Sequence, residues 1–304
     1  MEPQPGDRGA RGRFGGNAHE RSPVARHAPN VYAGRRTRPR LVSAETMTAP
    51  REGGDHAKRA YEDLAPSYDD YAEVFGYEYG QWTATLVAKA EELGLEGDRL
   101  LDVGCGTGLS FIPMLERGWR ATGCDISPEM LAVARGKVGD RAELVAADMR
   151  DLPRLGEFDL VWAVNNPLNY LRDGGELRAA LAGMRRNLAP QGMAAFDLVT
   201  LRTARAFIGE ESVVKSGRAK FTWRRQVRPE EVVPGSVATS RLLVDGDPAR
   251  SHVHRFRHFP EAEILAAIEA VGLRLVSALG ERNGELEPGL DEEAHSQAVY
   301  FCRA

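Results

Sequence analysis

The sequence is poor in cysteine and lacks long apolar runs. Its 304 residues include only three cysteines, Cys105, Cys124 and Cys302, with no CxxC pair. This count argues against a disulfide framework or a structural zinc site, so we expect no metal and a reducing, cytoplasmic location. No stretch approaches about 18 consecutive apolar residues, so no membrane span is expected. The net charge of −4 gives no general reason to expect nucleic acid as a partner.

The first fifty residues lack lysine and any regular spacing of apolar residues. Nine arginines against four acidic residues give this arm +5, so the other 254 residues carry −9. With six prolines and six glycines, the arm cannot bury enough apolar surface to offset its ordering entropy, and we expect residues 1–50 to be disordered. A secretory signal would need an apolar core of roughly 7–15 residues, which is missing. Two explanations stay open: the chain truly starts at Met47, or the basic arm binds nucleic acid.

Residues 51–304 have the pattern of one α/β domain. Two helical patterns occupy 55–94, and strands then alternate with helices, which predicts right-handed crossovers on a doubly wound, mostly parallel sheet. We expect seven strands, at 99–103, 119–125, 142–146, 158–164, 193–199, 273–279 and 297–302. Helices are expected at 109–117, 127–138, 176–188 and 260–271, and an acidic loop at 281–295.

One segment, about 205–259, interrupts this alternation. It holds β-prone runs at 212–215, 220–227, 237–244 and 252–259. Pro229, Pro234-Gly235 and Asp245-Gly-Asp-Pro248 separate these runs, and such residues are typical of turns rather than of crossover helices. The segment therefore predicts a small antiparallel β insertion.

The most informative motif is Leu100-Leu-Asp-Val-Gly-Cys-Gly-Thr-Gly-Leu109, at the first strand-to-helix turn. Its glycines let the chain turn tightly and let a ligand lie against bare backbone, and the following helix start offers N–H groups to an anion. Asp125 ends the next strand, 21 residues after Gly104, near the spacing at which a carboxylate meets ribose hydroxyls. A nicotinamide cofactor would favour G-x-G-x-x-G. Here the motif is G-x-G-x-G, and Asp102 would repel a pyrophosphate but suit an ammonium group, so a zwitterionic, ribose-bearing ligand is favoured over NAD.

Four segments, in order and spacing, resemble class I S-adenosylmethionine-dependent methyltransferases over roughly residues 55–200. Asp102–Gly108 is similar to the first motif of that family, and Gly123-Cys-Asp-Ile-Ser-Pro-Glu-Met-Leu131 to its second strand and helix. Ala147–Leu152 resembles its adenine-binding turn and Phe158–Trp162 its fourth strand.

The resemblance implies roles for the matched positions. Asp102 and the backbone of Gly104, Cys105, Gly106 and Gly108 would hold the methionine end of the cofactor. Asp125 would accept hydrogen bonds from both ribose hydroxyls, with Ile126 packed on the adenine. Asp148 would accept from the adenine amino group with Met149 beside the ring, and Asn165 would line the methionine pocket. Each position also has a purely structural explanation, as a turn residue, a helix cap or part of the core.

The segment Tyr61–Tyr71 resembles the N-terminal lid of small-molecule methyltransferases, in which Tyr68 matches the lid tyrosine; Tyr71 is better explained as a core aromatic. The subgroup that the chain resembles is the sugar and small-amine N-methyltransferases, which share the β insertion. Some members carry a histidine near the acceptor where this chain has Tyr170, so the catalytic base stays open.

The inserted strand at 252–259 supplies one more catalytic candidate, His254. His252, His254 and His258 fall on alternate positions and are expected on one strand face. Arg255 and Arg257, on the opposite face, could meet an acidic substrate, but solvated strand arginines are the favoured explanation.

These observations predict S-adenosylmethionine-dependent methyl transfer to a small-molecule acceptor by in-line displacement. Nitrogen is favoured over oxygen because a neutral amine needs no strong base. The alternatives are a small-metabolite O-methyltransferase and a non-catalytic, S-adenosylmethionine-binding partner subunit. Neither nucleic acid nor membrane is expected as a partner, since the folded part is acidic and lacks an Asn-Pro-Pro-Tyr-like motif for a flipped base. A monomer and a homodimer both stay open.

Overall fold

The computed structural model describes residues 56–74, 78–207, 212–216, 219–225, 227–247 and 251–304. All of these belong to one compact unit. The basic arm 1–50, expected to be disordered, and the alternative start at Met47 lie outside the described residues. Among the described helices, none combines the length and the apolar composition that crossing a bilayer needs.

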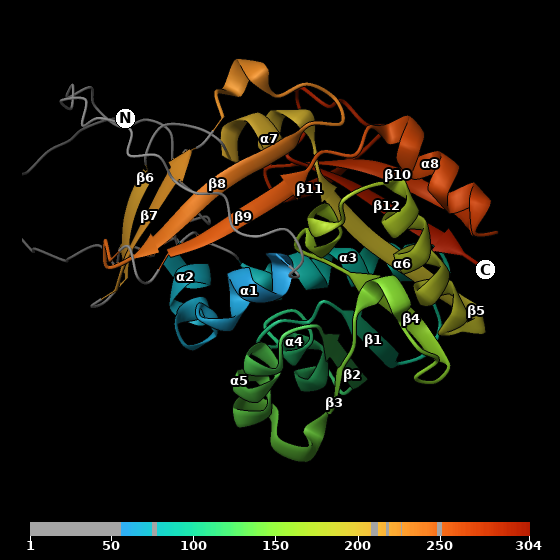
Figure 1. The fold of residues 1–304 in the computed structure, drawn as a ribbon. Helices are drawn as coiled ribbons and strands as arrows, with labels where there is room; N and C mark the ends of the chain where they lie inside the picture. Colours follow the sequence, from blue (N-terminus) through green and yellow to red (C-terminus); the bar gives the residue numbers. More distant parts are fainter. Residues whose placement is uncertain (1–55, 75–77, 208–211, 217–218, 226, 248–250) are drawn as a thin grey trace, which may run out of the picture. The chain divides into compact units, whose positions relative to one another are not determined.

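An eight-stranded sheet, in the order β11-β10-β12-β5-β4-β1-β2-β3, is the centre of the domain (Figure 1). Its strands are β1 Arg99–Val103, β2 Arg120–Asp125, β3 Glu143–Ala146, β4 Phe158–Ala163, β5 Leu188–Val199, β10 Arg274–Arg282, β11 Glu285–Pro288 and β12 Gln297–Arg303. Strands β1 to β5 pair in parallel, and β12, β10 and β11 extend the sheet antiparallel. The expected fold class is confirmed, with eight strands in place of seven.

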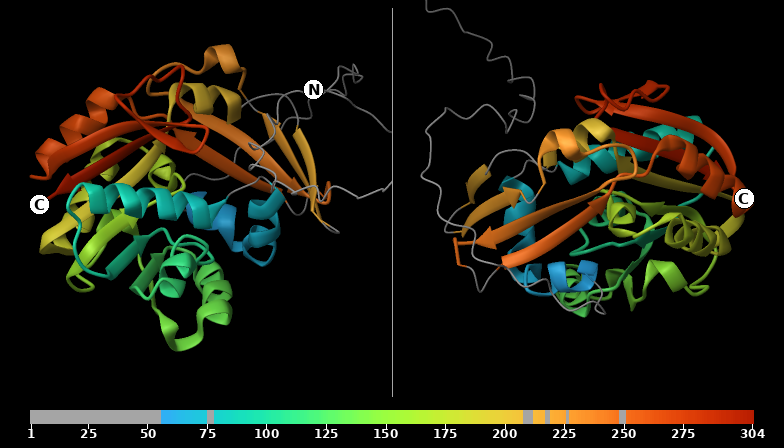
Figure 2. Two further views of the ribbon diagram at one scale, coloured as in Figure 1. Left: turned by 180° about the vertical axis from the view of Figure 1, so that it is seen from behind. Right: turned by 45° about the horizontal axis from the view of Figure 1, so that its top comes forward.

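Helices cover both faces of this sheet (Figure 1, Figure 2). The helices of the described residues are α1 His56–Glu62, α2 Tyr68–Val74, α3 Tyr79–Glu92, α4 Ile112–Glu116, α5 Pro128–Val138, α6 Gly174–Arg186, α7 Leu201–Phe207 and α8 Glu261–Ala270, with short 3₁₀ turns that include η3 Met149–Asp151 and η4 Pro167–Tyr170. Alternate strand residues point to opposite faces. Accordingly, Leu101 packs in the core shared with α6 and α8, whereas its neighbour Leu100 packs in the core shared with α3, α4 and α5.

Local capping explains where two helices begin. The Ser127 hydroxyl accepts the N–H of Met130 at 3.2 Å, ahead of Pro128 in the first turn of α5. Asp173 accepts the N–H of Glu176 at 2.9 Å and so begins α6. Each cap satisfies a backbone donor that has no partner within its helix.

Three elements differ from the sequence-based expectation. The helix expected at 109–117 begins only at Ile112, after a turn in which the Ile112 N–H bonds the Gly108 carbonyl at 2.9 Å. The expected loop at 281–295 contains β11. Asn283 and Gly284 have φ of 55° and 85°, as in the tight turn that folds a hairpin back on itself. Helix α7 was not predicted.

The expected antiparallel insertion is a four-stranded sheet, in the order β6-β7-β8-β9. Its strands are β6 Ser212–Ser216, β7 Ala219–Arg225, β8 Val237–Val244 and β9 Ser251–Arg257. The N-terminal helices lie beside this sheet (Figure 1). They share with it a core of Leu64, Tyr71, Phe221, Trp223, Leu242 and Val244. Tyr71 is therefore a core aromatic, as expected, and its partners lie in the inserted sheet.

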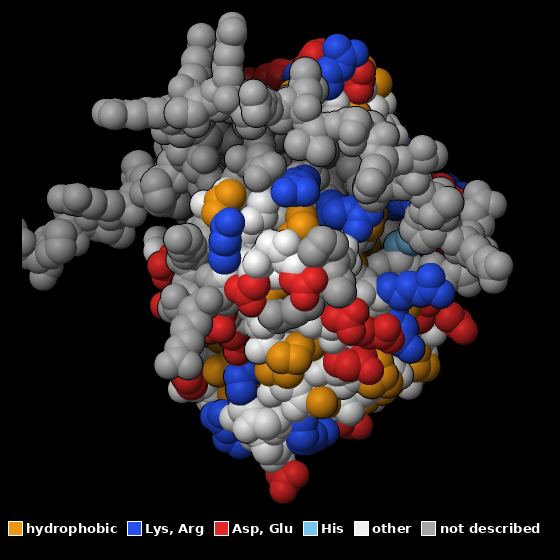
Figure 3. Space-filling model, turned by 60° about the vertical axis from the view of Figure 1, so that its left-hand side comes forward, with side chains coloured by type: hydrophobic (Ala, Val, Ile, Leu, Met, Phe, Trp, Pro, Cys, Tyr) orange, Lys and Arg blue, Asp and Glu red, His pale blue; other side chains and the backbone are white. Residues whose placement is uncertain are grey.

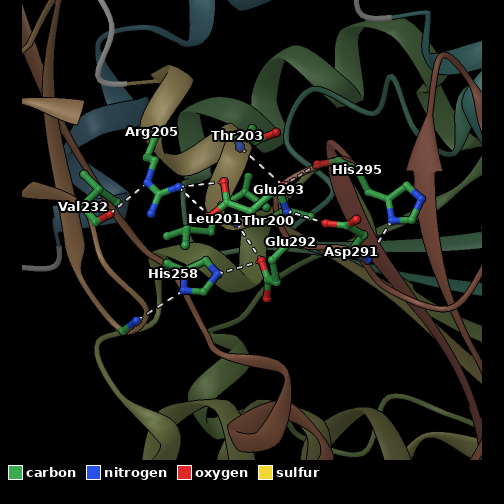
Figure 4. A network of polar contacts seen from close by, with 12 residues as sticks. Thr200, Leu201, Thr203, Arg205, Val232, His258, Asp291, Glu292, Glu293 and His295 are labelled. Atoms are coloured by element: carbon green, nitrogen blue, oxygen red, sulfur yellow. Dashed lines mark hydrogen bonds and ion pairs between the residues drawn. The ribbon is translucent and has the colours of Figure 1, made fainter. Parts of the chain in front are cut away.

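His252, His254 and His258 are all buried, as residues on one strand face would be, and His258 directly follows the last residue of β9, Arg257. The His258 Nδ1 accepts the N–H of Gly235, and its Nε2 lies 3.0 Å from the Glu292 carboxylate. The same Glu292 oxygen accepts the N–H of Leu201 at 2.7 Å, so this network (Figure 4) connects the inserted sheet to α7 and to the loop before β12.

Candidate active site

A cavity with about 910 Å³ of empty space lies at the carboxyl ends of β1 to β4. Ligands of open α/β sheets bind at this edge, where the strand order reverses. Most of the predicted site residues line this cofactor cavity: Gly104, Cys105, Gly106, Asp125, Ile126, Asp148, Met149, Asn165, Tyr68 and Tyr170.

The glycine loop presents backbone to the cavity. The N–H groups of Gly104 and Cys105 donate to the Cys124 carbonyl at 2.8 and 3.0 Å, which holds the loop against β2. Gly104 has a φ of +77°, and a Cβ there would lie 2.8 Å from the Cβ of Pro167. Only glycine fits both the dihedral angle and the space.

Asp125 presents a fixed carboxylate at the end of β2. One oxygen accepts the N–H of Gly106 and the other accepts the N–H of Ser127, both at 2.9 Å. Burial raises the pKa of this group, while these backbone donors oppose the rise. Because each carboxylate oxygen has two lone pairs, Asp125 keeps capacity to accept from two adjacent hydroxyls.

Asp148 is paired with a residue that sequence reasoning missed. The Arg150 guanidinium donates to both Asp148 oxygens, with its Nε 2.9 Å from each, and it also lines the cavity. Burial alone would raise the pKa of Asp148, but the Arg150 hydrogen bonds lower it below its ordinary value. Asp148 is thus an ionised acceptor beside Met149.

Asp102 and Gly108 do not line the cavity, in contrast to the expected direct contacts. Asp102 is 1% exposed and accepts a hydrogen bond from Ser110, which does line it. Burial raises the pKa of Asp102 to about 7, with Ser110 opposing the rise. Gly108 packs on the Phe111 ring. Leu109 and Ser110, where the helix was expected to begin, line the cavity, whereas α4 itself contributes no residue to the described wall.

A second unpredicted residue, Asp197 of β5, holds an unusual turn after β4. Asn165 and Asn166 both have a φ of 66°, in the left-handed region. Their N–H groups donate to the two Asp197 oxygens at 2.9 and 2.7 Å, and the Trp82 Nε1 adds a third bond at 3.1 Å. Burial raises the pKa of Asp197 to about 6. Such strain persists only where the surroundings enforce it, and it clusters at functional sites.

A second, smaller cavity adjoins the first, with about 470 Å³ of empty space. We call it the aromatic cavity. Its lining residues are Tyr61, Tyr68, Tyr71, Tyr79, Tyr170, Trp223, His254 and Phe256, with Asn165, Asn166 and Val199. Both cavities are lined by Tyr61, Tyr68, Tyr79, Asn165 and Tyr170. His254, predicted as a catalytic candidate, therefore lies in the aromatic cavity only.

Hydrogen bonds join the aromatic residues across distant segments. The Tyr170 hydroxyl lies 2.7 Å from the Tyr61 hydroxyl and 2.7 Å from the His254 Nδ1. Burial, and to a lesser degree His252, lowers the pKa of His254 to about 3, so this ring is neutral near pH 7. Tyr61 carried no signal in the sequence that separated it from a core aromatic.

The N-terminal helices are joined to the glycine loop by Asp69 of α2. One Asp69 oxygen accepts the Thr107 hydroxyl at 2.6 Å, and the other pairs with the Lys137 ammonium of α5 at 2.6 Å. Thr107 lies inside the glycine motif and lines the cofactor cavity. Asp69 thereby connects the segment that carries Tyr61 and Tyr68 to the loop they face.

The two strand arginines are not arranged for an acidic substrate. Arg257 forms two 3.0 Å bonds with Glu263 and lies 4.3 Å over the Phe259 ring, and Arg255 lies 3.0 Å from His56. Neither lines the two cavities. Within the described part of the chain, no three His, Cys, Asp or Glu side chains are grouped so that they could hold a metal ion.

This fold, with a glycine loop and a carboxylate at the ends of adjacent strands, defines an α/β domain that binds a nucleoside-type cofactor. Residues 100–192 match the model of a family described as a methyltransferase domain. The resemblance to class I S-adenosylmethionine-dependent methyltransferases is thereby confirmed.

Individual relatives agree with this assignment. The chain is 34% identical over 141 residues to the putative methyltransferase YqeM of Bacillus subtilis. The aligned segment covers 45% of this chain and 55% of the relative. The chain is 29% identical over 221 residues to a dTDP-3-amino-3,4,6-trideoxy-α-D-glucopyranose N,N-dimethyltransferase of Streptomyces venezuelae, covering 70% and 91%. The chain spans just over half the length of the first two curated relatives that it matches.

Solved structures have the same fold. DesVI of Streptomyces venezuelae superposes with a TM-score of 0.62 at 25% identity, covering 78% of this chain and 97% of that chain. An S-adenosylmethionine-dependent methyltransferase of Clostridium acetobutylicum gives a TM-score of 0.67 at 18% identity, covering 78% and 98%.

Proposed function

We propose that this chain transfers a methyl group from S-adenosylmethionine to a nitrogen of a small-molecule acceptor. The observation that carries the proposal is the pair of adjoining cavities: one built on a glycine loop and two carboxylates, the other on aromatic side chains. The dTDP-amino-sugar N,N-dimethyltransferases among the relatives support nitrogen as the acceptor atom.

The residues of the cofactor cavity fit S-adenosylmethionine. Bare backbone at Gly104 and Gly106 leaves room for the methionine chain, and the Asp125 carboxylate suits a ribose diol. Asp148 and Met149 would hold the adenine, and Asn165 lies on the wall shared with the aromatic cavity. Asp102 would act through Ser110, which it orients. When bound, this cofactor supplies an electrophilic methyl group on a sulfonium.

The lining of the aromatic cavity supports nitrogen rather than oxygen. A hydroxyl acceptor needs a base whose pKa lies near the working pH. Of the residues described around this cavity, none is a carboxylate or a lysine, and burial lowers the pKa of His254 to about 3. A neutral amine attacks through its own lone pair and needs no such base.

The protein's part in catalysis is then alignment and exclusion of water. Tyr61 and Tyr68 of the N-terminal segment line both cavities and so lie over the junction between cofactor and acceptor. Tyr170 bonds both Tyr61 and His254, so these side chains would position the acceptor rather than remove its proton.

The charge of the described surface and the state of the cysteines agree with the same proposal. The described face in Figure 3 carries acidic and basic side chains side by side rather than one extended basic area, which supports a small molecule over nucleic acid. All three cysteines are unpaired and buried, which supports a reducing, cytoplasmic location.

Calorimetric titration with S-adenosylhomocysteine tests the cofactor assignment. The wild-type chain should bind it and should not bind NADH. Asp125→Ala removes the acceptor for the ribose hydroxyls, so its affinity should fall roughly tenfold or more, as expected when charged hydrogen bonds are lost. Asp151→Ala is the matched control, because Asp151 is an exposed carboxylate one turn from the cavity and does not line it.

Circular dichroism of each variant shows whether a loss of affinity reflects unfolding. No binding of S-adenosylhomocysteine to folded wild-type chain contradicts the proposal. Binding of NADH alone would favour a dehydrogenase on the same glycine loop. With the cofactor site established, transfer of a labelled methyl group to amines, but not to matched alcohols, would support nitrogen.

A further inference from the structure

The aromatic cavity has a composition that restricts its ligand. Eight of its eleven lining residues are aromatic, and none of those described carries a formal charge at neutral pH. The rings come from three separate parts of the chain: the N-terminal helices, the turn at Tyr170, and strands β7 and β9. An ordinary core would be completed by aliphatic side chains, whereas Val199 is the one aliphatic residue among those described here.

The rings surround the cavity in different planes. Tyr61 and His254 meet at 86° with their centroids 5.4 Å apart, and Trp223 and His254 meet at 62° and 4.9 Å. Tyr61 and Tyr170 meet at 62° and 5.4 Å. Edge-to-face contacts leave ring faces, which carry negative charge density, available to a third group. A cation is the group that such faces attract.

Three residues that line this cavity each have a buried polar side-chain atom without a hydrogen-bond partner among the described residues. These atoms are the Asn165 Nδ2, the Asn166 Oδ1 and the His254 Nε2. Buried polar atoms are nearly always paired, so atoms left without a partner at a cavity indicate a ligand that supplies one. Hydrogen bonds to Asp197 hold the backbone of the two asparagines in the left-handed region. The surrounding structure therefore fixes the position of this turn.

We propose that the aromatic cavity binds the methylated nitrogen of the acceptor as an alkylammonium, with the unpartnered Asn and His atoms pairing a polar group two or three bonds away. This inference rests on the proposed N-methyl transfer. Methyl groups spread the charge of an ammonium and weaken its hydration, so ring faces compete with water for it better than for a primary ammonium. A carboxylate would instead hold the protonated, unreactive amine.

The class of ligand is therefore a small hydroxylated amine whose nitrogen becomes tertiary or quaternary. Arg255 and Arg257 are paired elsewhere, so the side chains described around the cavity offer no cation for a phosphate near the reacting nitrogen.

Two probes of nearly equal shape test the charge preference: choline, and 3,3-dimethylbutan-1-ol, in which a carbon replaces the nitrogen. Each is titrated calorimetrically into the full chain saturated with S-adenosylhomocysteine. We expect choline to bind roughly tenfold more tightly, the size of a partly desolvated cation–π contribution. Equal affinity, or a preference for the alcohol, overturns the proposal.

Paired substitutions assign the effect to the rings. Trp223→Leu and Tyr79→Leu should abolish most of the choline preference, whereas Trp223→Phe and Tyr79→Phe should keep most of it, because each retains a ring face. Trp223 also packs in the core shared with Tyr71 and Phe221, and Tyr79 also lines the cofactor cavity, so circular dichroism shows which variants are folded. A choline preference unchanged in folded Leu variants overturns the assignment.

Competition separates the two cavities. Choline that displaces S-adenosylhomocysteine would be bound in the cofactor cavity, where a sulfonium belongs, and would overturn the proposal. If the wild-type chain binds no S-adenosylhomocysteine yet discriminates choline from the alcohol, the proposed function fails while the charge preference of the aromatic cavity is supported.

Discussion

Two buried carboxylates, Asp102 and Asp197, and the half-buried Asp125 lie at or behind the cofactor cavity, and desolvation raises the pKa of each. The pKa is about 7 for Asp102 and about 6 for Asp197, and it is raised for Asp125. Buried carboxylates resist ionisation because low-dielectric surroundings stabilise charge poorly. A cationic ligand nearby would relieve this cost, so the electrostatics of the site favour a cofactor with a positive end.

The pH dependence of stability should reveal Asp102. Its pKa is about 7 in the folded protein against an ordinary 3.8, so between these values the folded state binds more protons than the unfolded state. The contribution of Asp102 to stability is then fully present below about pH 4 and is lost as pH rises through 7. Asp102→Asn cannot ionise but keeps an oxygen for the Ser110 hydroxyl. The free energy of unfolding of the variant, relative to wild type, should rise by about 2 kcal/mol between about pH 5 and pH 8.

Urea denaturation of both proteins at the two pH values measures this difference. Parallel changes in the two proteins would contradict the prediction, because they would mean that Asp102 does not titrate differently in the folded state.

The sequence predicted the site residues that stand in recognisable local motifs. It did not predict the residues whose role depends on contacts between distant parts of the chain. Asp125 was predictable because its spacing from Gly104 has a direct chemical meaning. Asp197 was not, since its partners Asn165 and Trp82 lie 32 and 115 residues away. Asp102 was placed in the cavity because the motif fixes its position in the chain and not the direction of its side chain. Tyr61 looks in sequence like any helix aromatic.

At the scale of elements, the strands of the parallel sheet were predicted correctly, whereas the start of α4 and the strand β11, which both follow turns, were not. Strands β1, β4 and β5 are mostly buried, as strands inside a parallel sheet are, and the alternation of strands with helices predicted that sheet. Helix α4 starts only after the turn that follows Gly108, and β11 was missed because its residues, Glu-Leu-Glu-Pro, have low β-propensity. That strand exists because the Asn283-Gly284 turn directs it against β10.

The N-terminal helices should depend on Asp69 for their closure over the cofactor. Asp69→Ala removes the acceptor of the Thr107 hydroxyl and the partner of Lys137. The hydrogen bond contributes about 1 kcal/mol, and the partly exposed ion pair adds less. Affinity for S-adenosylhomocysteine should therefore fall by roughly five- to tenfold, and hydrogen exchange should accelerate in residues 56–74.

Asp70→Ala is the control, because it removes the same charge from the exposed side of the same helix. If the two variants weaken binding equally, the effect is one of net charge, and the connection between α2 and the glycine loop has no role in closure.

At the scale of the whole molecule, the proposed site has two halves of different origin. The parallel sheet supplies most of the cofactor cavity, and the inserted sheet supplies Trp223, His254 and Phe256 to the aromatic cavity. Sequence reasoning predicted each sheet from its own pattern. It could not predict how they join, because Glu292 bonds both His258 and Leu201 across 34 and 91 residues.

Glu292→Ala should therefore separate the two halves functionally. The substitution leaves the buried His258 Nε2 and the Leu201 N–H without their acceptor, which costs about 1–3 kcal/mol. Because the contact anchors the inserted sheet, choline binding should weaken several-fold while S-adenosylhomocysteine binding changes little. Glu293→Ala is the matched control: Glu293 pairs only at the surface with Arg205, and such pairs contribute little. A Glu292→Ala protein that loses cofactor binding but keeps choline binding would contradict this division, since it would mean that the insertion supports the cofactor cavity instead.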